Sequence, residues 1–358
     1  MVIKGQATVV KHTGSHYLLS RLPEWDMFPA VLRGKIRLKG STATNPVAVG
    51  DVVDFESEVP DGVDVQELTA YVTPENAAVI TSVHPRSNYI IRKSTNLSRQ
   101  SHIIAANLDR AFLVMTLDFP QVKLPFLDRL LVTCEVYNVP PVIVVNKCDL
   151  YGPEHQDMLQ AFHEIYEGAG YPVVEVSAHT GQGVDILRGM VSGRMHADGT
   201  VNEDHDPSRP YISLFSGVSG VGKSSLIKAI DPSLNPRVGE ISDVHLQGKH
   251  TTTFYEMYHV APSHSEPASC HPEPVEGSGG FIVDTPGLRG FGLVDLKKEE
   301  IALYFPEMLQ AAQSCRFTPC THTHEPGCAV KEAVEAGTIS YDRYSSYLGM
   351  LDEEGKYR

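Results

Sequence analysis

The fold is decided by the stretch Gly217-Val218-Ser219-Gly220-Val221-Gly222-Lys223-Ser224. It matches the pattern G-x-x-x-x-G-K-[ST], follows an apolar run at 211–215, and opens a segment with helical spacing at 223–230. In that strand–loop–helix context, backbone N–H groups cradle the β-phosphate of a nucleotide, the lysine reaches the β- and γ-phosphates, and Ser224 ligates Mg²⁺. The sequence therefore predicts that this loop, with the adjacent Ser225, binds a nucleoside triphosphate of unspecified base.

A second motif selects the base. Asn146-Lys147-Cys148-Asp149 directly follows the apolar run 141–145. A carboxylate at the end of a strand can accept hydrogen bonds from the N1–H and the 2-amino group of guanine, a donor pair that adenine lacks. Asp149 therefore predicts GTP over ATP, with Asn146 fixing the base and the stem of Lys147 covering one of its faces.

Three further segments fit a guanine-nucleotide site. Ser177 and Ala178 follow an apolar run and would present a backbone N–H to the guanine O6. Asp284 of Asp284-Thr-Pro-Gly287 is placed to hold Mg²⁺ through water, and the Gly287 N–H would meet the γ-phosphate.

The third segment is a run of threonines. Thr251 and Thr252 could supply a hydroxyl to Mg²⁺, and we expect Thr252 to be the ligand beside Ser224. A run of threonines is otherwise a common way to begin a strand.

The order of these motifs is rotated. Apolar runs alternate with helical segments from about residue 105, which predicts a parallel sheet covered on both faces. In most GTPases the phosphate loop precedes the Asn-Lys-x-Asp motif, whereas here 146–149 precedes 217–224. We expect the polar, acidic stretch 197–210 to join the original termini. Residues 261–280, rich in Pro, Glu, Ser and Gly, are expected to be a disordered insertion.

The C-terminal segment contains a cluster of metal-ligating residue types. Cys315, Cys320, His322 and Cys328 lie within fourteen residues, and thiolate and imidazole ligands at short spacing are typical of structural, tetrahedral Zn²⁺. His324 is an alternative fourth ligand. The rest of the tail has helical spacing.

The N-terminal segment and the charge balance bear on partners. Five short apolar runs in about 80 residues predict a small barrel, for which the OB-fold and an SH3-like barrel both remain open. The net charge of the 358 residues is −14, yet residues 1–50 carry +5. Four basic residues in that region alternate along one predicted strand and therefore share one of its faces. Such a face suits either an RNA backbone or solvent. The four are Arg33, Lys35, Arg37 and Lys39.

The rotated motif order, the N-terminal barrel and the Cys-x4-Cys-x-His-x5-Cys tail resemble the RsgA/YjeQ family of circularly permuted GTPases. The resemblance implies an α/β P-loop GTPase domain (106–294) preceded by an N-terminal β-barrel of the OB-fold type (1–85) and a linker (86–105). It also implies a C-terminal α-helical zinc-binding domain (295–358).

The same resemblance implies a function. It predicts GTP hydrolysis stimulated by the small (30S) ribosomal subunit during late maturation, with GTP/GDP, Mg²⁺ and one structural Zn²⁺ bound. Leu288 stands where many GTPases carry a water-orienting Gln, and the family pattern points to His250 as the catalytic group instead.

The resemblance also sets expectations about partners. We expect the rRNA of the 30S subunit as a partner, no membrane or DNA partner, a monomeric chain and a cytoplasmic location. The alternative is an RNA- or ribosome-binding module in which GTP is a conformational ligand with negligible catalysis.

Overall fold

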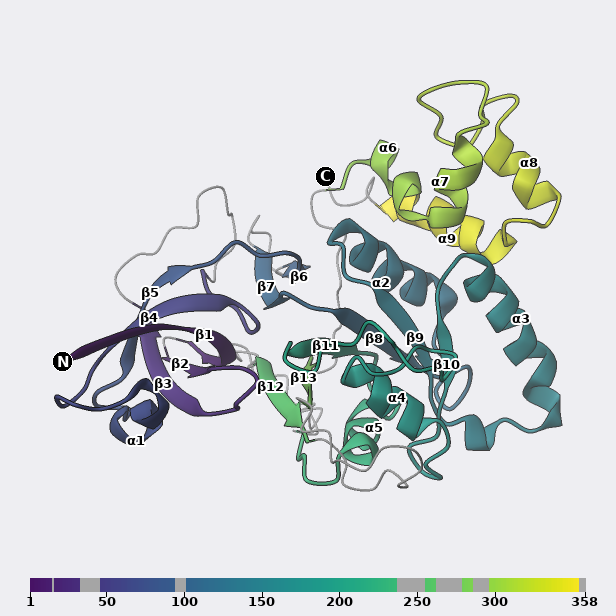
Figure 1. Cartoon of the computed structure of the whole chain (residues 1–358). Helices are drawn as coiled ribbons and strands as arrows, with labels where there is room; N and C mark the ends of the chain where they lie inside the picture. Colours follow the sequence, from purple (N-terminus) through teal and green to yellow (C-terminus); the bar gives the residue numbers. More distant parts are fainter. Residues whose placement is uncertain are drawn as a thin grey trace, which may run out of the picture.

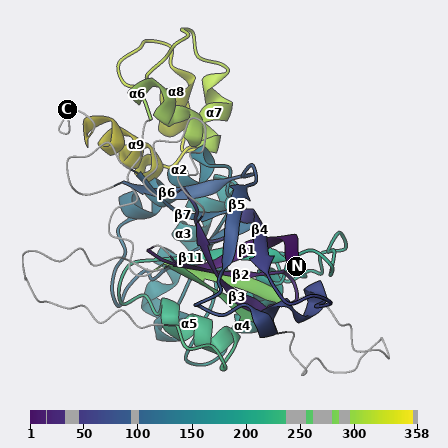
Figure 2. The ribbon, with the colours of Figure 1, turned by 90° about the vertical axis from the view of Figure 1, so that its left-hand side faces the viewer.

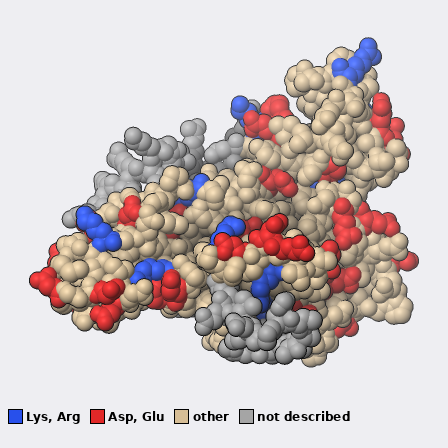
Figure 3. All heavy atoms as spheres, in the orientation of Figure 1, with Lys and Arg blue, Asp and Glu red and all other residues tan. Residues whose placement is uncertain are grey.

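The computed structural model describes residues 1–14, 16–32, 46–93, 101–236, 255–261, 279–285 and 296–353. The basic residues Arg33, Lys35, Arg37 and Lys39, and most of the predicted insertion, lie outside these ranges. On the face drawn in Figure 3, acidic side chains are spread over the nucleotide-binding domain and basic ones are few, in keeping with the negative net charge.

The N-terminal part is a closed five-stranded barrel (Figure 1). Its strands are β1 (Val2–Thr13), β2 (His16–Ser20), β3 (Met27–Leu32), β4 (Val52–Glu58) and β5 (Ala78–Val83). They pair in the order β1-β2-β3-β5-β4, and β4 closes on β1. Phe28 and Phe55 meet in the core with ring centroids 5.0 Å apart. This closed arrangement is that of the OB-fold, which resolves the choice that the sequence left open.

A parallel sheet follows, with helices on both faces (Figure 1). Its strand order is β10-β9-β8-β11-β13, with β12 added antiparallel at one edge. The bounds are β8 (Arg110–Met115), β9 (Pro141–Val145), β10 (Val173–Glu175), β11 (Tyr211–Ser216), β12 (Tyr255–Val260) and β13 (Gly280–Asp284). The helices are α2 (Leu124–Val136), α3 (Gln156–Gly168), α4 (Val184–Val191) and α5 (Lys223–Ile230). The strands read as apolar runs because both faces of the sheet are buried.

Three strands were not expected from the sequence. β12 pairs with both β13 and β1, so the barrel and the nucleotide-binding domain share one 11-stranded sheet. The stretch 86–105, expected to be a linker, carries most of an antiparallel pair formed by β6 (Tyr89–Lys93) and β7 (Ser101–Ala106). The polar segment between α4 and β11 contains an isolated antiparallel β-bridge between Met195 and Val201.

The C-terminal domain is helical and lies on α2 (Figures 1 and 2). Its helices are α6 (Lys298–Ile301), α7 (Pro306–Ala312), α8 (Ala329–Glu335) and α9 (Tyr341–Glu353). The helical spacing of the tail predicts continuous helix up to the cysteine cluster, but the helix is interrupted because Phe305 is extended and Pro306 starts a new helix.

A buried ion cluster fixes this domain to the nucleotide-binding domain. Arg343 of α9, 1% exposed, donates to Asp128 of α2 (2.8 Å) and to Glu307 of α7 (2.8 Å). Tyr166 of α3 donates to the same oxygen of Asp128 (3.0 Å). The guanidinium also lies 4.6 Å from the ring centroid of Phe305. Each buried charge has opposite charges and hydrogen bonds, which is what burial requires.

Replacement of Arg343 by Met should lower the free energy of unfolding by about 3–5 kcal/mol, because it leaves the Asp128 carboxylate buried without its cation. Urea unfolding followed by circular dichroism measures the change. Arg316→Met, at an exposed position in the same domain, is the control and should stay within about 0.5 kcal/mol of wild type. Equal effects of the two substitutions would contradict this account of the interface.

Candidate nucleotide site and metal cluster

The glycine-rich loop leaves no room for side chains at its two ends. Gly222 has φ 88° and precedes Lys223, the first residue of α5. A Cβ on Gly222 would lie 2.4 Å from Nδ2 of Asn146, and a Cβ on Gly217 would lie 2.4 Å from the carbonyl oxygen of Val114. The loop is therefore packed against its neighbours through its backbone, so that N–H groups and the helix N-terminus are free to bind an anion.

Lys223 is nearly buried beside the carboxyl end of β13. Its ammonium donates to the carboxylate of Asp284 and to the carbonyl oxygen of Thr285. The Thr285 hydroxyl in turn donates to the carbonyl oxygen of Phe215 at 2.7 Å. Because Phe215 and Asp284 are register partners, the phosphate loop and the Asp284 segment leave the sheet side by side. Ser224 is partly exposed at the start of α5, and Ser225 is exposed.

Asn146 connects the base motif to the phosphate loop. Its side chain is buried, with the residue 1% exposed. Its Nδ2 donates to the carbonyl oxygen of Val221 at 2.8 Å, and its Oδ1 accepts from the N–H of Ala178 at 3.2 Å. One amide thus fixes three loops that follow three different strands.

Lys147 and Asp149 lie at the open side of this arrangement. Lys147 has φ 65°, and its ammonium donates to the carbonyl oxygens of Phe119 (2.6 Å) and Gly220 (2.7 Å). Asp149 is exposed and accepts from the Ser177 hydroxyl at 2.5 Å. An ionised carboxylate has about four acceptor positions, so Asp149 retains capacity for a base.

Two residues of the site were missed by sequence reasoning. The Tyr151 hydroxyl accepts from the N–H of Leu117 (2.9 Å) and donates to the carbonyl oxygen of Asn146 (3.1 Å). These two bonds hold the backbone of the base motif in place. Phe119 contributes through its carbonyl oxygen. Neither residue type is specific to such a role, and only the spacing of Tyr151 from Asp149 could have drawn attention to it.

In the tail, the ligand atoms of Cys315, Cys320, His322 and Cys328 lie within 4.8 Å of one another. Nδ1 of His322 is 3.3 Å from Sγ of Cys328 and 3.7 Å from Sγ of Cys315. His322 is buried, whereas the alternative ligand His324 is exposed with its ring bonded to the hydroxyl of Thr323 at 2.9 Å. The donor set and its compactness suit a tetrahedral metal ion.

The loop that carries these ligands is held by its own hydrogen bonds. The Tyr344 hydroxyl donates to the carbonyl oxygen of His322 (2.5 Å), where φ is 56°. The carboxylate of Glu325 accepts the N–H groups of Thr321 (2.7 Å) and Thr323 (3.0 Å). Such outer contacts orient metal ligands.

Four sequence-predicted site residues lie outside the part of the chain that the structure describes. They are His250, Thr251, Thr252 and Gly287.

A model of the family described as RsgA GTPase matches residues 83–197 and 208–294. The chain belongs to this family. Small ribosomal subunit biogenesis GTPases RsgA from Bacteroides fragilis and Porphyromonas gingivalis are 42% and 40% identical to it, over 98% of this chain and 98% and 97% of their own lengths.

Solved structures agree with this RsgA assignment. YjeQ from Thermotoga maritima is 29% identical, covers 98% of both chains and has a TM-score of 0.69. YloQ, described as a circularly permuted GTPase, is 23% identical, with coverage of 99% and 96% and a TM-score of 0.65, and this likeness supports the fold.

As a member of the RsgA family, the chain is a GTP hydrolase with a circularly permuted nucleotide-binding domain. The permutation is visible in the sheet, where the Asn146 strand β9 precedes the phosphate-loop strand β11 in sequence. Among the described residues, no helix has the length and apolar character needed to cross a membrane.

Replacement of Asn146 by Ala should raise the Kd for GTP about tenfold or more. Without the Asn146 bonds to Val221 and Ala178, the two loops must be ordered by the nucleotide itself, so about 1–3 kcal/mol of the binding free energy is spent on holding them in place. Isothermal titration with GTP measures the change. Asn202→Ala is the control. It removes a comparable hydrogen bond from a side-chain amide, to the carbonyl oxygen of Gly193 in the segment between α4 and β11, and should leave the Kd unchanged. An unaltered Kd in Asn146→Ala would contradict the bridging role.

Proposed function

We propose that this RsgA GTPase hydrolyses GTP in response to the small ribosomal subunit during its late maturation. The observation that carries the proposal is the 40–42% identity, along nearly the full length of both chains, to proteins named small ribosomal subunit biogenesis GTPases. The OB-fold barrel supports an rRNA partner, since such barrels bind single-stranded nucleic acid. A ribosomal partner also implies a cytoplasmic location.

The residues fit a guanine nucleotide with Mg²⁺. The loop 217–225 would hold the phosphates, since its glycines leave the backbone open, and Asp149 would accept from the base. Ser224 and Thr252 would ligate Mg²⁺, with Asp284 acting through water. Mg²⁺ neutralises charge on the transferred phosphoryl group.

His250 is proposed to position or deprotonate the attacking water. The proposal rests on Leu288, which cannot hydrogen-bond a water, and on the ability of His to exchange a proton near neutral pH.

Phosphate release from GTP should rise about 10²-fold or more when 30S subunits are added, the contribution expected when a positioned base is completed. Addition of 50S subunits should leave the rate unchanged. His250→Ala should lose most of the stimulation while its Kd for GTP stays within twofold of wild type. Lys223→Ala is the negative control because it loses GTP binding. A rate unaffected by 30S subunits would reject the proposal in favour of GTP as a conformational ligand.

The cysteine cluster is proposed to hold one structural Zn²⁺. The four side chains would supply all the ligands that a tetrahedral ion takes, as in structural zinc sites, and would leave no open position for catalysis.

Metal analysis should find one Zn²⁺ per chain in wild type and in His324→Ala, and none in Cys320→Ser. Removal of the ion by a chelator should unfold the C-terminal domain, since metal binding and folding are coupled in such sites. The Kd for GTP should change little, because the nucleotide loops belong to other elements. Retention of full zinc content by Cys320→Ser, or its loss from His324→Ala, would overturn the ligand assignment.

A further inference from the structure

The barrel and the nucleotide site are connected through one row of side chains. β12 pairs antiparallel with β13 on one side and with β1 on the other. Glu256 of β12 is the register partner of both Asp284 and Lys11. Directly opposed residues of antiparallel strands project from the same face of a sheet. A row of charged side chains therefore runs from the carboxyl end of β13, beside the phosphate loop, to the barrel.

Charge is balanced along this row. Nζ of Lys11 lies 2.7 Å from Oε1 of Glu256, and the two side chains are 22% and 29% exposed. Asp284 is paired with Lys223. Without the two lysines, the opposed carboxylates would repel each other. A bound nucleotide draws the phosphate-loop lysine toward its phosphates. The ion pair of Asp284, the register partner of Glu256, thus depends on the state of the nucleotide site.

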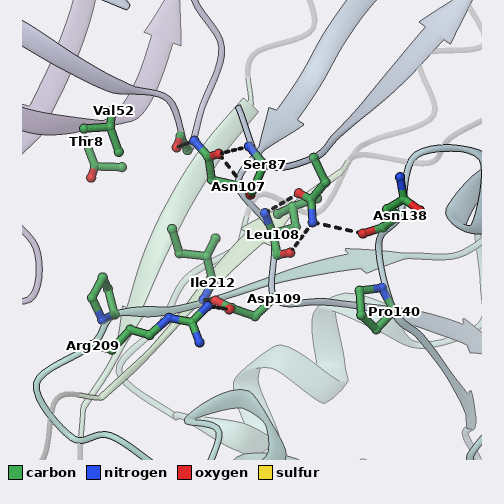
Figure 4. Close-up of a pocket in the computed structure, with 13 residues that line it drawn as sticks. Thr8, Val52, Ser87, Asn107, Leu108, Asp109, Asn138, Pro140, Arg209 and Ile212 are labelled. Atoms are coloured by element: carbon green, nitrogen blue, oxygen red, sulfur yellow. Dashed lines mark hydrogen bonds and ion pairs between the residues drawn. The ribbon is translucent and has the colours of Figure 1, made fainter. Parts of the chain in front are cut away.

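The barrel and the nucleotide-binding domain also adjoin at the opposite end of the strands. A cavity of about 400 Å³ lies between the barrel and the nucleotide-binding domain, near the amino ends of β8 and β11 (Figure 4). Thr8 and Gly50 line it from the barrel, and Ile212 from β11. The lining amides of Asn88 and Asn107 are bonded to backbone groups of Leu108 and Gly50. Because these amides are used within the protein, and Asn107 bonds the barrel residue Gly50, we interpret the cavity as a gap in interdomain packing and not as a ligand site.

Trp25, in the barrel, lies where the barrel meets β12 and β13. It is the only tryptophan in the sequence. Its ring centroid is 5.7 Å from that of His259 on β12 and 5.6 Å from that of Phe281 on β13. The barrel therefore touches the nucleotide-binding sheet through an indole that would report its displacement.

We propose that the Lys11–Glu256 pair is a positioning contact through which the barrel controls GTP hydrolysis. When the barrel engages its partner, the pair transmits the barrel's position to β12, and β12 sets the position of Asp284 relative to the phosphate loop. This inference rests on the proposed stimulation by the small ribosomal subunit and assigns to it a route through described residues.

The test compares Lys11→Met and Glu256→Gln with the conservative variant Lys11→Arg, which keeps the ion pair with Glu256. The matched control is Lys4→Met, since Lys4 pairs with Glu56 (2.8 Å) on the same strand but wholly within the barrel. Phosphate release is measured with and without 30S subunits, together with the Kd for GTP, the affinity for the subunit and the Tm. Each single variant should reduce the 30S-stimulated kcat about tenfold, a typical size for coupling between sites. Both affinities should stay within twofold, and Lys11→Arg should keep most of the wild-type rate.

The outcomes separate the two proposals. If wild-type protein is not stimulated, the proposed function fails. If wild type is stimulated and Lys11→Met behaves as Lys4→Met does, the positioning role is refuted. A rate in Lys11→Arg as low as that in Lys11→Met, or a loss of rate that follows a loss of subunit affinity or Tm, refutes it as well.

Trp25 fluorescence gives a readout that needs no ribosome. Emission should differ between the GDP complex and the complex with a non-hydrolysable GTP analogue in wild type and Lys4→Met, and the difference should shrink in Lys11→Met. The proposed coupling would be rejected if the emission of wild type were the same with both nucleotides, or if the difference were equal in all three proteins.

Discussion

The structure of the nucleotide site depends on the buried amide of Asn146. Parallel strands bring their carboxyl ends to one edge of a sheet, where backbone hydrogen bonds such as that from the Cys148 N–H to the Val176 carbonyl oxygen (3.1 Å) continue only briefly beyond the strands. The Asn146 side chain connects the loops further out, with one bond to the phosphate loop and one to the Ser177–Ala178 segment. Since these contacts are spatial, the order in which the chain visits the strands is immaterial. The rotated order of motifs is compatible with an intact site for this reason.

The parts of the site that sequence predicted are those whose chemistry is local. Gly217 and Gly222 stand where a Cβ would collide, Gly220 has φ 91°, and the three cysteines crowd into a short loop. The choice between His322 and His324 could not be made from spacing. Backbone conformation buries one ring and leaves the other bonded to Thr323 at the surface.

The parts that sequence missed involve residues far apart in the chain. Asp128 and Arg343 are 215 positions apart, and Lys11 and Glu256 are 245. A charged residue in a helical or strand pattern is ordinarily a solvent-facing one, so nothing local marks Arg343 as a buried anchor. β12 was missed because its mixed sequence, Tyr-Glu-Met-Tyr-His-Val, belongs to a strand at the boundary of two domains. Its pairing is defined by the barrel on one side and the parallel sheet on the other.

The pairing of β1 with β12 also has a consequence for solubility. A six-stranded sheet ending at β12 would present a row of unpaired backbone groups, and open edges of this kind pair readily with other chains. β1 covers part of that edge and Trp25 packs over β12 beside it. The barrel is therefore a cap for the nucleotide-binding sheet as well as a separate domain. A fragment that lacked the barrel would expose the unpaired edge of β12 and would tend to self-associate, even though every nucleotide motif would still be present.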